Sequence, residues 1–348
     1  MFFILKRGLN CSAFEKYTKM NNKINIALVC GGSSSERPVS FESAKGVESI
    51  LDKEKYHVFI VCVGSDEDTT SMYVQWNGMR FNVDRNNFSF ELNGKTIRFD
   101  FAYITVHGEP GENGVFQGYL ESVNVPYSTC GVLTSALTYN KYKCAKYLDA
   151  FSIRSPETIL VDTRKSEFSG VKAISYPRFM KPNLGGSSIG ACVIASYESL
   201  MFKLFDKGVL QSEFLLQELL SGTEVTCGAY QTYSGINVLP ITEIKTDNEF
   251  FDYEAKYQGK SREITPAEIG DDLTRKIQDT TKNIYEILGC RGIVRIDYII
   301  MDGEVYFLEV NTTPGMTSKS IIPQQIKSAG LDITQVFTDI IEFNKKLD

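Results

Sequence analysis

Apolar and polar positions alternate along this chain in blocks that predict strands and helices in turn. An apolar run at 24–30 stops at Gly31-Gly32, and a helical pattern follows at 39–51. Further apolar runs at 57–63 and 99–106 predict two more strands. Strands that alternate with helices favour a mostly parallel sheet covered on both faces. Residues 65–98, which hold the only tryptophan, Trp76, predict an irregular hairpin region with a packing role.

The second half of the chain has shorter strands and a different order of elements. A helical pattern covers 133–151, and short strands are expected near 157–161, 176–181 and 190–195. Strands near 214–218, 224–232 and 237–245 follow, then a helix at 267–288 and two long strands. We expect an α/β protein whose C-terminal part is α+β, with domains at 23–128, 129–216 and 217–348. Residues 1–22 are either a loose N-terminal extension, or the protein truly starts at Met20.

Composition narrows the class of function. The formal net charge of −6 does not favour a nucleic-acid partner. The two histidines, His57 and His107, are too few for a histidine-rich zinc site. Eight cysteines without a Cys-x-x-Cys pair are typical of buried, reduced thiols in a cytoplasmic protein. No run of about 18 apolar residues predicts a membrane span, and no membrane partner is expected.

The segment RIDYIIMDGEVYFLEVNTTPGMTS carries the strongest chemical signal. Its two strands bring Asp297, Glu309 and Asn311 beside Arg295, and oxygen ligands of this kind suit Mg²⁺. A two-residue Asp-Gly turn would put Asp297 and Glu309 on opposite faces, because side chains alternate along a strand. We therefore predict a three-residue loop, Met301 to Gly303, which puts the four polar side chains on one face of the hairpin. The other face is then apolar and includes Tyr306 and Leu308. The alternative is an ordinary half-solvated hairpin.

Two glycine-rich loops are further candidates. The segment FMKPNLGGSSIG could wrap phosphate oxygens with the backbone of 185–188, while Lys181 supplies positive charge, or it could be a plain flexible turn. It lacks the Walker A spacing. The segment GGSSSERPVSFESA lacks Gly-x-Gly-x-x-Gly, so a Rossmann cofactor is disfavoured. Its Glu36 and Arg37 either face a substrate ammonium group or are exposed loop charges.

Two more segments carry chemistry-bearing side chains. In HGEPGENG, His107 follows a buried strand and is interpreted as functional rather than structural. The charged segment FFDYEAKYQGKSREITP, with Tyr253 and Tyr257, is either a mobile lid over 246–262 or a solvated face.

Taken in order, these segments resemble the D-alanine–D-alanine ligases of the ATP-grasp superfamily, from about Ile24 to the C-terminus. The most specific stretches are HGEPGENGVFQGYLE, GVLTSALTYNKYKCAKYL, DYEAKY and RIDYIIMDGEVYFLEVNTTPGMTSKSIIP. The resemblance implies a three-domain ligase that joins two D-alanines through a D-alanyl phosphate, for peptidoglycan precursor synthesis. It also implies ATP between the central and C-terminal domains, two Mg²⁺ ions or Mn²⁺, a cytoplasmic location and, by analogy, a homodimer.

The resemblance also implies roles at the nucleotide end of the site. The metal ligands would be Asp297, Glu309 and Asn311. Residues matched to nucleotide binding would contact phosphates, ribose or adenine: Lys141, Lys181, Ser188, Gln217, Glu218, Leu220, Glu224 and Lys256. Gln217 and Glu218 depart from the acidic and then less acidic residues that the family often has near adenine, so the adenine contacts stay open. Pro38 also stands where many relatives carry a polar residue.

At the substrate end, the resemblance implies that Glu36 binds the ammonium group of the first D-alanine. Glu36 would also join Ser187 and Tyr257 in a hydrogen-bonded link that closes the lid. His107 would lie near the first carboxyl group, and Arg295 would stabilise the tetrahedral intermediate. Ser320, with the backbone near Ile321, would hold the second carboxylate.

Three other functions are weighed against this one. D-lactate or D-serine could be the second substrate, although Tyr257 within Glu-Ala-Lys-Tyr favours the dipeptide. A nucleotide-binding regulator without catalysis is disfavoured by the full set of charged residues. An NAD-dependent oxidoreductase is weaker still, because no dinucleotide fingerprint is present.

Overall fold

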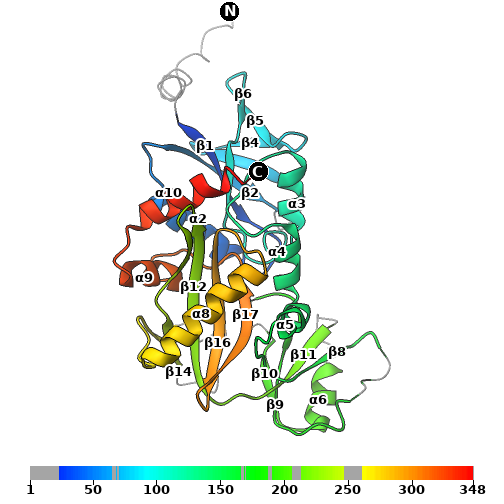
Figure 1. Cartoon of the computed structure of the whole chain (residues 1–348). Coiled ribbons are helices and arrows are strands. Elements are labelled where there is room, and N and C mark those ends of the chain that lie inside the picture. Colours follow the sequence, from blue (N-terminus) through cyan, green and yellow to red (C-terminus); the bar gives the residue numbers. More distant parts are fainter. Residues whose placement is uncertain are drawn as a thin grey trace, which may run out of the picture.

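The computed structural model describes residues 23–64, 68, 70–165, 168, 170–186, 190–205, 213–246 and 261–347. A seven-stranded sheet in the order β6-β5-β4-β3-β2-β1-β7 forms the upper part of the molecule (Figure 1). The parallel pairing expected from the sequence holds for β7, β1 and β2, and the remaining strands extend the sheet as antiparallel hairpins. The strands are β1 (Ile24–Gly31), β2 (Tyr56–Val63), β3 (Met72–Trp76), β4 (Met79–Asp84), β5 (Ser89–Leu92), β6 (Lys95–Arg98) and β7 (Phe101–Ile104).

Strand β1 is apolar from Ile26 to Cys30 because both of its faces are buried there. Ile26 and Leu28 enter one core cluster, which also holds residues of α2 (Arg37–Ile50). Ala27 and Val29 point to the other face and join a second cluster with residues of α3 (Val115–Ser122). A strand covered on both faces reads as a continuous apolar run, as the sequence predicts.

The region around Trp76 is a series of tight hairpins. Asn77 and Gly78 have φ of 49° and 75°, which fits the two-residue turn that joins β3 to β4. The Trp76 ring lies 4.8 Å from that of Phe59, centroid to centroid. Trp76 therefore has the packing role expected for it.

The helix predicted over 133–151 is two helices, α4 (Val132–Tyr139) and α5 (Lys141–Asp149). Asn140 has extended backbone angles, and its side chain accepts a 3.0 Å hydrogen bond from the Lys143 N–H, which caps α5. The prediction of one helix was wrong because the apolar pattern of the two short helices runs on through the cap. The break places Lys141 at the start of a helix.

A four-stranded sheet of order β10-β9-β11-β8 follows, and its pairs are antiparallel. Apolar side chains of α6 (Tyr197–Leu204) join the core of this sheet, at the lower right of Figure 1. Its strands are β8 (Thr158–Asp162), β9 (Arg178–Pro182), β10 (Cys192–Ile194) and β11 (Glu213–Glu218).

The third sheet lies against the long helix α8 (Asp271–Ile287), which packs Ile277, Ile284 and Tyr285 onto it. The strand expected at 237–245 is two strands separated by Leu239–Ile241, because Pro240 has no N–H group to continue a ladder. The strands of this sheet are β12 (Thr223–Thr232), β13 (Gly235–Val238), β14 (Thr242–Thr246), β15 (Ser261–Ile264), β16 (Ile293–Met301) and β17 (Glu304–Asn311).

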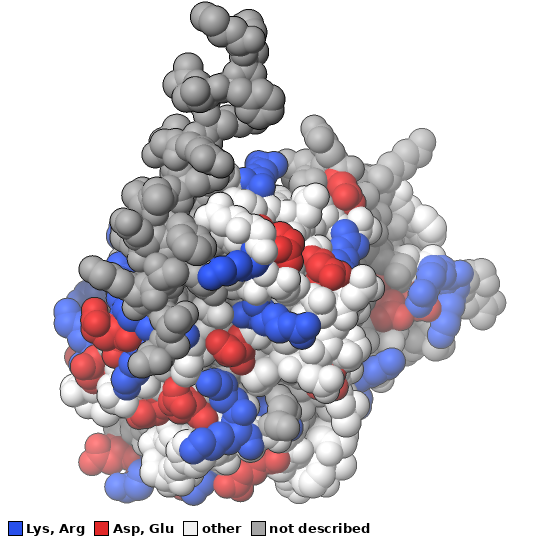
Figure 2. Space-filling view, turned by 90° about the horizontal axis from the view of Figure 1, so that it is seen from above, with Lys and Arg blue, Asp and Glu red and all other residues white. Residues whose placement is uncertain are grey.

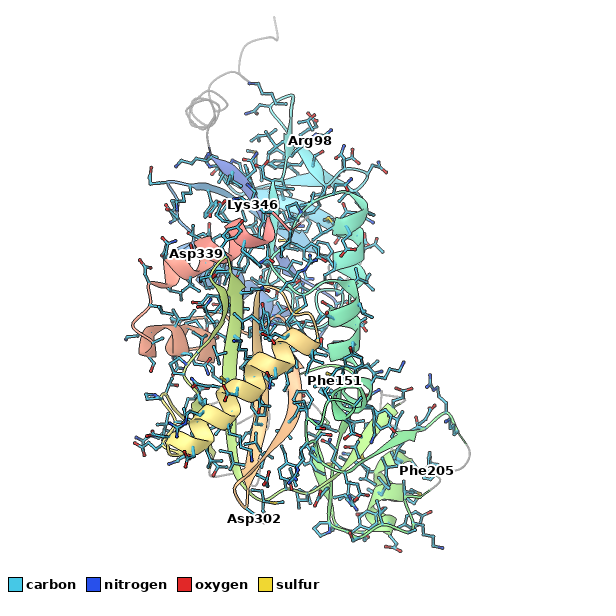
Figure 3. The ribbon with its side chains drawn as sticks, in the orientation of Figure 1. Arg98, Phe151, Phe205, Asp302, Asp339 and Lys346 are labelled. Carbon is cyan, nitrogen blue, oxygen red and sulfur yellow. The ribbon has the colours of Figure 1, made fainter. Side chains whose placement is uncertain are left out.

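The chain ends by returning to the first sheet. Ile322 and Ile326 of α9 (Ile321–Ser328) and Phe337 of α10 (Ile333–Asn344) enter the core cluster of β1. The rings of Tyr103 and Phe337 stack at 5.5 Å. Asp302, at the tip of the β16–β17 hairpin, lies at the bottom of Figure 3, whereas Asp339 and Lys346 of the C-terminal region lie in its upper half. The C-terminal helices thus hold the third sheet to the first.

Charged side chains of both signs share the surface, and the cysteines lie mostly inside. Acidic and basic side chains are interspersed on the face drawn in Figure 2. No helix in the described ranges is both long and apolar enough to cross a membrane. The described cysteines are free thiols, as expected, and all but the half-buried Cys192 are buried: Cys30, Cys62, Cys130, Cys144, Cys227 and Cys290.

Helix α2 packs closely on the C-terminal region where Gly46 meets Met316. A Cβ on Gly46 would lie 2.1 Å from the Met316 carbonyl oxygen, whereas a Cβ on Gly118 of α3 would meet nothing closer than 3.7 Å. We expect Gly46→Ala to lower the free energy of unfolding by about 1–3 kcal/mol or more through overpacking. Gly118→Ala, the matched helical control, should raise it by about 0.5–1 kcal/mol. Urea unfolding measures both, and equal effects would contradict the close approach.

Candidate active site

The turn between β16 and β17 differs from the prediction. Met301 pairs with Glu304, so the loop is the two residues Asp302 and Gly303, with φ of 51° and 77°. Positive φ at both positions is typical of a type I′ hairpin turn. The predicted three-residue loop was wrong, and with an unbroken ladder this turn would separate Asp297 from Glu309.

A β-bulge at Leu308 returns Asp297 and Glu309 to the same face of the hairpin. Tyr298 pairs with Phe307 while Asp297 pairs with Glu309, so Leu308 is an extra residue in β17. Beyond the bulge, Arg295 lies opposite Asn311. The insertion shifts the alternation by one, so Val305 and Phe307 fill the core in place of the predicted Tyr306 and Leu308.

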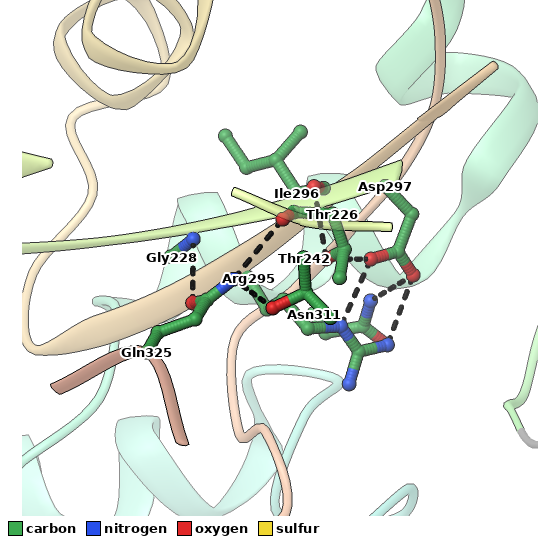
Figure 4. Close-up of polar contacts among 8 residues, drawn as sticks. All are labelled: Thr226, Gly228, Thr242, Arg295, Ile296, Asp297, Asn311 and Gln325. Atoms are coloured by element: carbon green, nitrogen blue, oxygen red, sulfur yellow. Dashed lines mark hydrogen bonds and ion pairs between the residues drawn. The ribbon is translucent and has the colours of Figure 1, made fainter. Parts of the chain in front are cut away.

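Asp297 is 6% exposed and is surrounded by donors. Arg295 binds it with both ends of its guanidinium group, Nε to Oδ1 and Nη2 to Oδ2, each at 2.9 Å (Figure 4). Asn311 Nδ2 donates to Oδ2 at 3.0 Å, and the Thr226 hydroxyl on β12 donates to Oδ1 at 2.5 Å. A buried carboxylate with this many charge-assisted and neutral bonds is held in one orientation.

Two lysines from other elements lie beside Glu309. The Nζ atoms of Lys141, at the start of α5, and Lys181, on β9, each lie 3.8 Å from Glu309 Oε2. These side chains are largely buried, with exposed fractions of 11%, 13% and 18% for Lys141, Lys181 and Glu309. Two cations beside a carboxylate, one from a helix and one from the second sheet, form a positive site suited to an anionic group.

Asn183 sets the position of both lysines. It is fully buried and accepts the Tyr142 N–H through Oδ1 at 2.9 Å, while its carbonyl accepts the Lys141 N–H at 3.2 Å. Its Nδ2 donates to Glu213 Oε2 at 2.8 Å. This side chain therefore fixes the beginning of α5 against the end of β9.

A pocket connects these groups with the N-terminal loops. Lys141 Nζ donates to the Gly185 carbonyl at its edge. Glu36 lies across the glycine loop, because a Cβ on Gly186 would be 2.9 Å from Glu36 Oε2. The pocket is lined by Glu112, Thr138, Tyr139, Lys141, Gly185, Gly186, Glu309, Val310, Asn311 and Thr312.

His107 and Glu112 tie the N-terminal loop to the segment after β17. The His107 Nε2 lies 2.9 Å from the Ser43 hydroxyl, and Glu112 Oε2 accepts the Gly108 N–H at 2.7 Å. Both side chains also hydrogen-bond to the backbone of Thr313. Burial lowers the pKa of His107, with Arg295 acting in the same direction, so the imidazole is neutral at pH 7. Burial, with Glu36 nearby, raises the pKa of Glu112 to about 8.

Comparisons with known proteins decide the family. Models described as the D-ala D-ala ligase N-terminus and C-terminus match residues 25–130 and 151–342. The D-alanine–D-alanine ligase of Bacteroides fragilis is 48% identical over 92% of this chain and 99% of its own length. The chain belongs to the D-alanine–D-alanine ligase family.

Other relatives are consistent with this membership. A D-alanine–D-alanine ligase of Phocaeicola vulgatus is 47% identical over 92% of this chain and 99% of its own length. A solved D-Ala:D-Ser ligase from Enterococcus faecalis has a TM-score of 0.81 at 27% identity, covering 92% and 99% of the two chains. A ligase from Bacillus anthracis complexed with ATP has a TM-score of 0.73 at 26% identity, covering 93% and 98%.

The residues matched to the family's acceptor site lie at the start of α9. Ser320 is its N-cap residue, and the Ser320 Oγ accepts the Thr317 N–H at 3.0 Å. Ile321 is buried beside it. A helix N-terminus presents backbone N–H groups that suit a carboxylate.

The residues matched to adenine and ribose lie on β11 and β12 or between them. Gln217 is buried and donates to the Thr158 hydroxyl at 2.9 Å, while Glu218 is exposed and Leu220 half-buried. Glu224 lies two residues before Thr226 on β12, so it shares the face that carries Asp297. Ser187, Ser188, Lys256 and Tyr257 lie outside the described residues.

Three residues of the site were missed by the sequence reading: Glu112, Asn183 and Thr226. Glu112 lies within the HGEPGENG segment that was singled out for His107, so a signal existed. Asn183 likewise lies within the FMKPNLGGSSIG segment that was singled out for Lys181. Thr226 acts through Asp297, which is distant in sequence, and nothing local marks it.

The raised pKa of Glu112 yields a pH prediction. Its pKa in the folded chain is about 8 against an ordinary 4.5, so the stabilisation present below pH 4.5 is lost as pH rises toward 8. Glu112→Gln removes this titration, so the unfolding free energies of the variant and the wild type should diverge over that window, by at most about 1.4 kcal/mol per pH unit. Urea unfolding in chelator at pH 5 to 8 measures this. The exposed Glu48→Gln is the control, and parallel curves for Glu112→Gln would refute the buried titration.

Proposed function

We propose that this chain joins two D-alanine molecules into D-alanyl-D-alanine at the expense of ATP, through a D-alanyl phosphate. The observation that carries the proposal is the pair Asp297–Glu309, flanked by Arg295, Lys141 and Lys181, in a chain 48% identical to a D-alanine–D-alanine ligase over nearly its whole length. Because ATP is available in the cytoplasm, we expect the chain to act there.

The donor set fits a hard divalent cation. Asp297, Glu309 and Asn311 offer carboxylate and amide oxygens on one face of the hairpin. Mg²⁺ usually keeps phosphate oxygens and water among its ligands, so these three side chains need to supply only part of its shell. These residues would hold two Mg²⁺ or Mn²⁺ ions, which would supply charge neutralisation at the transferred phosphate.

The first half-reaction needs an anion-binding site and a fixed carboxylate. Lys141 and Lys181 offset the negative charge of the phosphates, so the D-alanine carboxylate oxygen can attack the γ-phosphate. The bond between the β- and γ-phosphates breaks and ADP leaves. Glu36 binds the ammonium group of that D-alanine, and neutral His107 lies near its carboxyl group. Since Glu36 lies against Gly186, substrate and phosphate loop meet at one point. Lys256 and Ser188 would add phosphate contacts, and Tyr257 and Ser187 would close the lid and exclude water.

In the second half-reaction, the amine of the second D-alanine attacks the acyl phosphate carbonyl. The start of α9, at Ser320 and Ile321, holds its carboxylate, which orients the amine. Arg295 stabilises the negative charge of the tetrahedral intermediate, and phosphate leaves. Nucleotide binding extends to Gln217, Glu218, Leu220 and Glu224. A homodimer is part of the same proposal, and light scattering of the purified chain tests it.

The named relatives differ in their second substrate, which bears on the substrate of this chain. The solved D-Ala:D-Ser ligase has the same fold at 27% identity, whereas relatives at 47% and 48% are named D-alanine–D-alanine ligases. We therefore expect D-alanine as acceptor rather than D-serine or D-lactate. Mass spectrometry of products from ATP, Mg²⁺ and each acceptor decides. A chain that folds and binds ATP without forming dipeptide would refute the function.

Replacement of Arg295 tests its proposed role at the tetrahedral intermediate. Arg295→Met should lower kcat by roughly a hundredfold or more, because one oxyanion donor is typically worth about 3 kcal/mol in the transition state. Arg295→Lys should recover little, because an ammonium group cannot make the paired contact to Asp297. The matched control is Arg98→Met on exposed β6, far from the hairpin (Figure 3). Phosphate release measures all three, and full activity of Arg295→Met would exclude the role.

A further inference from the structure

Strand β12 has a gap along one edge, beside the residue that holds Asp297. On that edge β12 pairs with β14 through Thr226 and with β13 from Ala229 onward. The segment between those two strands contains Pro240, which has no N–H group. The Thr226 carbonyl and the Gly228 N–H point to the same side of the strand, and both lie at this gap.

The side-chain amide of Gln325, on α9, fills the gap. Its Oε1 accepts the Gly228 N–H at 3.1 Å, and its Nε2 donates to the Thr226 carbonyl at 3.0 Å (Figure 4). The second hydrogen of Nε2 is directed to the Thr242 hydroxyl at 3.1 Å, on the first residue of β14. The amide pairs with β12 as a peptide group of a neighbouring strand would. Gln325 is completely buried, so no water replaces these bonds.

Gly228 is what allows α9 to come this close. A Cβ at position 228 would lie 2.6 Å from Gln325 Oε1 and 2.6 Å from Ile322 Cδ1. Contacts that short do not occur, so a larger residue would push α9 off the strand. The arrangement therefore couples the helix to the strand at one point.

We propose that Gln325 is a positioning residue that couples the acceptor end of the site to the metal-binding carboxylate. On one side, it lies on the helix whose first turn, at Ser320 and Ile321, receives the second substrate in the proposed function, on which this inference rests. On the other side, it fixes the peptide of Thr226, whose hydroxyl donates to Asp297 Oδ1 at 2.5 Å. Helix α9 and Asp297 thus share one hydrogen-bonded path.

The first test replaces the amide with an apolar side chain of similar length. Gln325→Met should weaken Mn²⁺ binding by about tenfold to a hundredfold, the range expected when a partner of a metal ligand is lost. It should also raise the KM of the second D-alanine. Mn²⁺ binding is followed by electron paramagnetic resonance of the full chain with a non-hydrolysable ATP analogue. The matched control is Gln335→Met on α10, whose exposed amide donates to Asp339, and it should match the wild type.

Thr226 variants separate the two ends of the path and do not depend on the fold of Gln325→Met. Thr226→Val keeps the shape and removes the hydroxyl, so Mn²⁺ binding should weaken by a similar factor while the KM of the second D-alanine stays near the wild-type value. Thr226→Ser restores the hydroxyl and should recover Mn²⁺ binding. The double variant Gln325→Met/Thr226→Val should bind Mn²⁺ as tightly as whichever single variant binds it less tightly, because both changes act along one path.

The outcomes distinguish this inference from the proposed function. Mn²⁺ affinity within twofold of the wild type in Thr226→Val, or in folded Gln325→Met, overturns the coupling even if the wild type makes dipeptide. If the wild type binds Mn²⁺ and nucleotide but makes no dipeptide, the proposed function fails. Weakened Mn²⁺ binding in both variants would still support the path to Asp297.

Discussion

The site depends on the pairing of Asp297 with Glu309 across the β16–β17 hairpin. That pairing requires an odd residue in β17, and Leu308 supplies it. The register is held by the opposite face, where Tyr298, Val305 and Phe307 are buried against α8 and its neighbours. A slip by one residue would move these side chains out of the core. The apolar face therefore fixes the polar one, and the turn itself does not decide it.

The carboxylates of this pair are tolerated because cations reach them from other parts of the fold. A buried carboxylate without partners would lose several kcal/mol of hydration free energy, whereas one with a guanidinium group and amide donors is compensated. Arg295 comes from the same strand as Asp297, but Lys141 and Lys181 come from α5 and β9. Asn183 joins those two elements, so the positive half of the site forms only when α5 is docked on the second sheet.

The ends of the chain complete the site from opposite directions. The N-terminal loops bring Glu36, His107 and Glu112 to the pocket, and the C-terminal helices bring Ser320 and Gln325. Both groups are anchored on the same core cluster, which contains residues of β1, α9 and α10. Thr313 lies where they meet, because His107 and Glu112 both bond its backbone. The loops proposed to face the substrate and the helix proposed to receive the acceptor thus belong to one packed unit. The strands proposed to face the nucleotide are positioned against it.

The sequence by itself determined the strand predicted at 24–30, the hairpin with its four polar residues, and the family to which the chain belongs. These signals are local: a run buried on both faces, and side chains close together along two consecutive strands. It did not determine the bulge, because Tyr306 and Leu308 are as apolar as Val305 and Phe307 and either set fits a core. Nor did it determine the break at Asn140, the lysine positions set by Asn183, or the amide of Gln325 in the gap of β12. Each of these depends on a contact between residues far apart in the chain, and only the packed tertiary structure supplies the partner.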